Sequence, residues 1–220
     1  MAGEDIWDVY REIHKGMRHA LFSVTAQAGR TDADDPCALA ALLAEWRDVA
    51  FVLRGHHSHE DDFCDVLIVQ HAPELRDTLE DQHALANDAL LALDRAAREL
   101  SQAESPSVQP FYLELASFTG RYLEHLRYEE ERVMPALARA MSNEALAGLT
   151  AQIRGSVPPE DMCVFIKYMV PGMNLAERLD MLGGMHRFAP PEIFELFRAA
   201  AQRALHARDY DVIASRLGIA

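Results

Sequence analysis

Apolar residues recur at helical spacing through four long stretches between residues 5 and 141, and no stretch alternates apolar and polar residues as a half-buried strand does. The pattern predicts helices over about 5–28, 36–69, 74–100 and 110–141. Short turns rich in Gly, Pro, Asp and Ser separate them, and an Asp followed by Pro36 is a typical helix start. Because short connections make neighbouring helices antiparallel, we predict an all-α fold, an up-down-up-down four-helix bundle.

The last third of the chain has a different pattern. From residue 145 onward the apolar stretches are shorter and are broken by Gly and Pro, and Asn174 and Glu177 have the spacing of a capping box. We therefore predict two parts, a bundle over 1–142 and a helical extension over 143–220 that packs on it. Five of the nine methionines fall in the extension, where they either fill its core or form an adaptable surface for a protein partner or a second copy of the chain.

Inside the bundle segment, one set of residues occurs twice with identical spacing. His14, His56 and Glu60 in the first half of the bundle recur as His83, His125 and Glu129 in the second half. Residues four apart share a helix face, and each of the six falls on the apolar face of its predicted helix. His57 is almost as inward as His56, but it corresponds to Leu126 in the repeat, so the repeat selects His56.

Histidine and glutamate on buried helix faces indicate a metal site. One inward histidine is more often a hydrogen-bonded core residue, and one inward glutamate is more often paired with arginine. Six such residues on four helices, in duplicated register, favour a pair of metal ions instead. Cys64, one turn beyond Glu60, is expected to be a small buried hydrophobic residue in preference to a ligand or redox partner. Arg18 and Asn87 are equivalent in the repeat and either hydrogen-bond site carboxylates or extend to water, and Tyr10, one turn before His14, is a candidate hydrogen-bond donor.

Four motifs in a fixed order carry a family resemblance: His14-Lys-Gly-Met-Arg18, His56-His-Ser-His-Glu60, Leu79-Glu-Asp-Gln-His83 and His125-Leu-Arg-Tyr-Glu129. Over about residues 8–140 the chain resembles the hemerythrin-like, or HHE cation-binding, family, and residues 145–220 resemble a C-terminal helical extension of some bacterial members. The resemblance implies a non-haem centre of two iron ions joined by an oxo or hydroxo bridge. By this resemblance, His14 and His56 bind one iron, His83 and His125 bind the other, and Glu60 and Glu129 bridge both.

One departure from the family pattern bears on function. Oxygen-carrying hemerythrins use a fifth histidine, one turn away on the third helix, where this chain has Leu79 and Asn87. Each metal then keeps an open position, which suits binding or sensing of oxygen, nitric oxide or peroxide more than strict oxygen carriage. Two alternatives are a di-iron enzyme that acts on peroxide or oxygen, and a helical interaction module with a structural metal. The donors favour iron but also suit zinc, manganese or nickel.

The amino-acid composition bears on which classes of partner the protein can bind and on its location. The net charge of −14 repels phosphate backbones and anionic lipid, so we expect neither a nucleic acid nor a membrane partner. Three cysteines without C-x-x-C spacing indicate a reducing compartment, and neither an export signal nor an apolar run long enough to span a membrane is present. We therefore expect a cytoplasmic protein.

Overall fold

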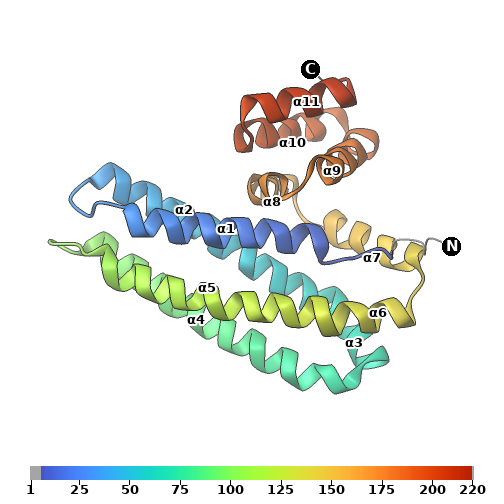
Figure 1. The fold of residues 1–220 in the computed structure, drawn as a ribbon, viewed down its shortest axis with the longest axis horizontal. Helices are drawn as coiled ribbons and strands as arrows, with labels where there is room; N and C mark the ends of the chain where they lie inside the picture. The colour runs from blue at the N-terminus through green and yellow to red at the C-terminus, as the bar shows by residue number, and fades with distance from the viewer. Residues whose placement is uncertain (1–5, 220) are drawn as a thin grey trace. The chain divides into compact units, whose positions relative to one another are not determined.

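The computed structural model describes residues 6–219, and within them the fold is all-α, without strands. The bundle consists of α1 (Arg11–Arg30), α2 (Pro36–His59) with its continuation α3 (Asp65–His71), α4 (Arg76–Gln102), and α5 (Val108–Tyr128) with its continuation α6 (Met134–Ala140). Figure 1 shows α2, α4 and α5 running side by side, as the sequence pattern predicts. The all-α, four-helix bundle with further C-terminal helices is confirmed.

Two helix starts show how local sequence and tertiary contacts divide the control of helix ends. The Asp35 side chain accepts hydrogen bonds from the N–H groups of Cys37 and Ala38 at 2.9 and 3.2 Å, which is the predicted cap of α2. The sequence predicts a first helix from about residue 5, which lies outside the described residues, but α1 begins only at Arg11. Side chains bond the backbone before it: the Tyr10 N–H donates to Asp8 Oδ1 at 3.0 Å and the Trp7 N–H donates to Asn143 Oδ1 at 2.9 Å.

The bundle core is tied together around Trp46 on α2. Its indole N–H donates to Asp94 Oδ1 on α4 at 3.0 Å, and its ring packs edge-on against Phe111 and Phe118 of α5, with centroids 5.9 and 6.5 Å away. The C-terminal half of α1 joins through the hydroxyl groups of Thr25 and Thr119, which lie 3.0 Å apart. These contacts fix the helical faces that carry the predicted site residues.

Two long helices contain a π-helical turn at equivalent positions. The segments η1 (Glu60–Cys64) and η3 (Glu129–Val133) follow α2 and α5, and each begins at the glutamate of the repeat. The carbonyl of Glu60 accepts from the Asp65 N–H, and that of Glu129 accepts from the Met134 N–H, which is the i to i+5 pattern of a π turn. The sequence pattern predicts unbroken helices here, because helical periodicity does not reveal one extra residue in a turn.

Contacts along the chain divide it into two compact units, and α1 contributes to both. The bundle unit holds residues 20–149 with the segment that ends at Tyr10, and the C-terminal unit holds 11–19 and 150–220. The predicted boundary between residues 142 and 143 stays a prediction. The C-terminal unit contains the second half of α7 (Asn143–Ser156), and α8 (Pro159–Gly172), α9 (Leu175–Phe188), α10 (Pro191–Ala204) and α11 (Ala207–Leu217).

The C-terminal unit has the local features that the sequence predicts. Asn174 and Glu177 form a complete capping box at the start of α9, with bonds of 2.9 and 3.1 Å. Four of the five methionines of this region are buried, so they serve the core, and these four are Met162, Met169, Met173 and Met181.

Within the C-terminal unit, α8 packs very closely on the N-terminal half of α1. A Cβ atom on Gly172 would lie 2.6 Å from the carbonyl oxygen of Lys15, and one on Gly16 would lie 2.9 Å from Cα of Met169. Backbone atoms cannot yield as the end of a side chain can, so these two positions need glycine for close approach. Lys15 Nζ also forms an ion pair with Glu177 at 2.5 Å.

This contact generates a stability prediction. We expect Gly172→Ala to lower the free energy of unfolding by about 1–3 kcal/mol, the usual cost of overpacking. The matched control is Gly148→Ala, because nothing lies within 4 Å of a Cβ built there. Alanine at this helix interior should raise the free energy of unfolding by about 0.5–1 kcal/mol. Urea unfolding followed by circular dichroism measures both, and equal effects of the two substitutions would contradict the packing argument.

Candidate metal centre

Five of the six predicted residues converge in the core of the bundle unit. They come from three places: His56 and Glu60 from the junction of α2 and η1, His83 from α4, and His125 and Glu129 from the junction of α5 and η3. The Nε2 atoms of His56 and His83 lie 3.4 and 3.3 Å from the same Glu60 oxygen, Oε2. His125 Nε2 lies 3.3 Å from Glu129 Oε1, and the Nε2 atoms of His56 and His83 each lie 3.8 Å from a Glu129 oxygen.

The two carboxylates dominate the electrostatics of this cluster. Glu129 is fully buried and Glu60 is 4% exposed. Burial first, and then the neighbouring Glu129 carboxylate, raise the pKa of Glu60 well above its usual range. Burial alone would lower the pKa of His83, but its contacts with Glu129 and Glu60 outweigh burial and raise that pKa to about 10. Two acidic groups held together away from water call for positive charge between them.

The donor chemistry fits a transition-metal cation. One ligand atom from each of His56, Glu60, His125 and Glu129 can be chosen so that all four lie within 4.8 Å of one another. Imidazole nitrogen together with carboxylate oxygen suits iron, zinc and their neighbours, whereas an all-oxygen set would suit calcium or magnesium. The cluster is therefore built from the residues that the sequence repeat singles out.

His14, the sixth predicted residue, belongs to the C-terminal unit. It lies in the N-terminal half of α1, and its side chain is fully buried. Its part in the metal centre rests on the sequence repeat and stays a prediction.

His57 is also buried in the bundle core, but its nitrogens have other partners. Nε2 lies 2.9 Å from the Tyr122 hydroxyl and Nδ1 lies 3.3 Å from Asn87 Oδ1. Burial first, and then His56 and the other neighbouring histidines, lower the pKa of His57 to about 3, so its ring is neutral. It lies close enough to His83 and His125 for one nitrogen from each to fall within 4.8 Å of the others. The preference for His56 as ligand stays a prediction.

Gln82 is a site residue that the sequence did not identify. Its Oε1 lies 2.9 Å from Nδ1 of His125. Because an amide oxygen only accepts, Nδ1 carries the proton and the lone pair of Nε2 is directed toward Glu129. His83 has a similar neighbour, since Asp61 Oδ1 lies 3.6 Å from its Nδ1. The sequence signal for Gln82 is weak, because its partner lies on another helix.

Cys64 and Tyr10 border the cluster. Both side chains are buried, at 2% and 3% exposure. Burial, then the carboxylates of Glu60 and Glu129, raise the pKa of the Cys64 thiol well above its usual range, which keeps it protonated. A protonated, buried thiol fits the predicted role of a small hydrophobic residue.

A comparison with models of known protein families identifies the family of the chain. The model of the hemerythrin HHE cation-binding domain matches residues 5–137, which is more than half of the chain. The chain belongs to this hemerythrin family. All six predicted donors, from His14 to Glu129, fall within the match, so cation binding by the histidine and glutamate cluster agrees with the family. Comparisons of this hemerythrin-domain chain with curated proteins and with solved structures gave no match.

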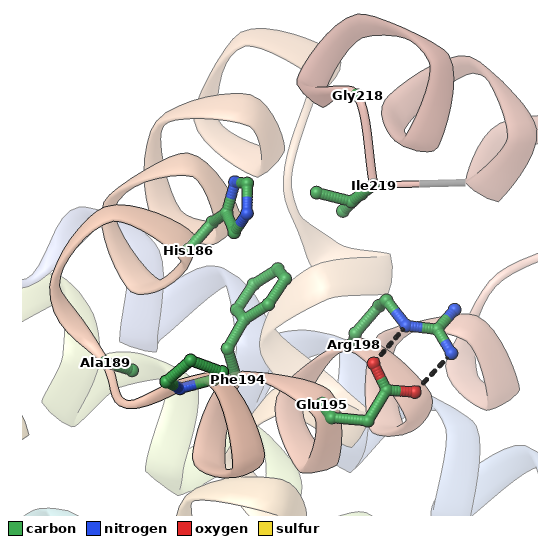
Figure 2. Close-up of a pocket in the computed structure, with 8 residues that line it drawn as sticks. His186, Ala189, Phe194, Glu195, Arg198, Gly218 and Ile219 are labelled. Carbon is green, nitrogen blue, oxygen red and sulfur yellow. Dashed lines mark hydrogen bonds and ion pairs between the residues drawn. The ribbon is translucent and has the colours of Figure 1, made fainter.

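Two features lie outside the metal cluster of the hemerythrin domain. Across residues 6–219, none of the helices combines the length and the apolar character needed to cross a bilayer. The C-terminal unit has a cavity of about 460 Å³ between α9, α10 and the chain end, lined by His186, Phe194, Arg198 and Ile219 among others. Figure 2 shows that the Arg198 guanidinium there is turned toward Glu195, with which it forms an ion pair.

The contact of Gln82 predicts a loss of metal affinity on substitution. We expect Gln82→Ala to weaken metal binding about 10–100-fold, because His125 loses the acceptor that orients it. Gln102→Ala is the matched control, since Gln102 is an exposed residue at the end of the same helix. Competition of each variant with a chelator of known affinity measures the effect, and unchanged affinity in Gln82→Ala would remove Gln82 from the site.

Proposed function

We propose that the chain is a non-haem di-iron protein whose metal pair binds oxygen, nitric oxide or peroxide. The observation that carries the proposal is the position of the two carboxylates. Glu60 Oε2 lies 3.4 Å from His56 and 3.3 Å from His83, which the family resemblance assigns to different metals. A carboxylate that faces both sets of imidazoles supports the bridging role that the di-iron proposal needs.

Glu129 supports the same arrangement from the second copy of the repeat. Its Oε1 lies 3.3 Å from His125 and 3.8 Å from His83, while its Oε2 lies 3.8 Å from His56. In the proposed centre, His83 and His125 hold one iron, and His56 holds the other together with His14, which the repeat adds. When bound, the irons supply Lewis acidity and reversible redox chemistry. The protein side chains orient them and exclude water.

The missing fifth histidine supports ligand binding at the metals. Leu79, at one of the two candidate positions, is 3% exposed and offers no donor. Asn87, at the other, is engaged with His57 at 3.3 Å. The proposed metals therefore keep open positions for a small ligand, which favours binding or sensing over the fully ligated oxygen carrier.

A di-iron enzyme acting on peroxide or oxygen is the second candidate function. The buried tyrosines Tyr10 and Tyr122 favour it, because both are 2–3% exposed and both lie near the two carboxylates, whose charges contribute to raising their pKa values after burial itself. Such groups can exchange electrons with a metal pair. Cytoplasmic location and a protein partner on the C-terminal unit stay predictions.

Metal analysis tests the proposal. Anaerobic loading should give two irons per chain, and oxygen should then produce the visible absorption of a bridged pair. Iron at about 100 times its Kd should raise the free energy of unfolding by about 2.7 kcal/mol. His56→Ala and His125→Ala should lose iron, while His71→Ala, an exposed histidine of α3, should not. Fewer than two irons in the unsubstituted protein would refute the di-iron assignment.

The role of His14 has its own test. His14→Ala should reduce the iron content from two to about one per chain, because one ion loses an imidazole while both bridging carboxylates remain. His19→Ala is the control, since His19 lies on the same helix and outside the repeat. Iron analysis and anomalous scattering at the iron edge measure the outcome, and full occupancy in His14→Ala would exclude His14 as a ligand.

A further inference from the structure

Three side chains form a hydrogen-bonded chain across the bundle unit, beside the metal cluster. Asn87 on α4, His57 on α2 and Tyr122 on α5 are joined by contacts of 3.3 Å at Nδ1 and 2.9 Å at Nε2 of the histidine. The rings of His57 and Tyr122 are nearly parallel, with centroids 5.5 Å apart. None of the three belongs to the donor set that the sequence repeat defines.

The hydrogen-bond partners fix the direction of this chain. The Asn87 Oδ1 atom can only accept, so Nδ1 of His57 carries the ring proton. A neutral imidazole has one donor and one acceptor, so Nε2 accepts the hydrogen bond from the Tyr122 hydroxyl. The phenol of Tyr122 therefore points its proton at an unprotonated imidazole nitrogen, 2.9 Å away and shielded from water.

Tyr122 is also next to a predicted metal ligand. Its ring centroid lies 5.4 Å from that of His125, and its side chain is 2% exposed. At this separation an electron can pass between the phenol and a metal held by His125 without any movement of the helices. The same ring therefore lies against the hydrogen-bond acceptor His57 and against the predicted ligand His125, whose own ring centroids are 5.6 Å apart.

The repeat offers an independent reason to assign a role to the pair. In the register of the repeat, Tyr122 corresponds to Leu53 and His57 corresponds to Leu126. Both leucines are fully buried, so leucine satisfies the bundle at the equivalent positions. His57 comes from the first copy of the repeat and Tyr122 from the second, and the two equivalent positions hold a pair of leucines. Burying two polar groups is costly unless they hydrogen-bond with each other. Packing alone does not require Tyr122 or His57.

We propose that Tyr122 is a redox-active tyrosine that gives up one electron while its phenolic proton passes to Nε2 of His57. The inference rests on the proposed di-iron function, and the oxidant is hydrogen peroxide acting through the metal pair. Peroxide takes two electrons and two solvent protons to give two waters. One electron comes from Tyr122 and one from the metals. The O–H bond of Tyr122 breaks, an N–H bond forms on His57, and an external one-electron donor later reverses both changes.

Tyr10, another buried tyrosine near the two carboxylates, has a thiol beside it. It lies against Cys64, whose thiol hydrogen-bonds with it and stays protonated because burial raises its pKa. A protonated thiol is a poor proton acceptor. Tyr10 is therefore a matched internal control for a buried tyrosine close to the same carboxylates.

Electron paramagnetic resonance of the iron-loaded protein tests the inference. Rapid freezing after addition of hydrogen peroxide should trap a tyrosyl radical, identified by narrowing of its signal with ring- or β-deuterated tyrosine. Tyr122→Phe should abolish the signal and Tyr10→Phe should leave it. His57→Gln keeps a hydrogen-bond acceptor but has no imidazole nitrogen to take the proton. The rate of radical formation should therefore fall about a hundredfold, the lower end of what a positioned proton acceptor contributes, and the yield trapped at a fixed early time should fall with it.

Iron content and circular dichroism of each variant are measured first, so that loss of metal or fold is told apart from loss of the radical. Two irons per chain without a tyrosyl radical overturns the inference and leaves the di-iron function intact. A radical that persists in Tyr122→Phe also overturns it, and an unchanged yield in His57→Gln removes His57 as proton acceptor. A protein that binds no iron refutes the proposed function and this inference together.

Discussion

The burial of two carboxylates against each other is the constraint on which the rest of the bundle depends. Glu60 and Glu129 are 4% and 0% exposed and share contacts with three imidazoles. Burial and the neighbouring Glu129 raise the pKa of Glu60, and the two carboxylates together raise the pKa of His83, which places a positive charge beside them. Trp46 joins the same three helices, α2, α4 and α5, through its hydrogen bond to Asp94 and its edge-on contacts with Phe111 and Phe118.

Much of this arrangement could be predicted from the sequence, because the signals are periodic. Helical spacing predicts the bundle, and the repeat that relates His14 to His83 predicts the inward histidines and glutamates. Five of the six then meet in the structure. Helical periodicity shows which face of a helix is buried, but it does not show which side chains of neighbouring helices are in contact. The contact of Gln82 with His125 and that of His57 with Tyr122 arise from how neighbouring helices face each other.

Two other differences have equally local causes. The first helix begins at Arg11, because the Tyr10 N–H, which a helix from residue 5 would direct at the carbonyl of Ile6, donates to the Asp8 side chain. The Trp7 N–H donates to Asn143, a partner too distant in the sequence for local propensity to report. The helices that carry Glu60 and Glu129 contain π turns. The sequence pattern does not reveal them, because a π turn shifts the backbone hydrogen bonds without changing the composition of the helix. Pro135, which lacks an N–H, follows the second π turn but has no counterpart after the first, so proline is not the common cause.

The paired π turns also bear on how the two halves of the bundle are related. A π turn holds one residue more than a regular helical turn, and here it occurs at the same point of two helices. Their separation along the chain equals that of the two sets of donors. The two halves of the repeat therefore share a backbone feature as well as their donors. The two displaced hydrogen bonds, from Asp65 to Glu60 and from Met134 to Glu129, align the halves in the same register without reference to any histidine.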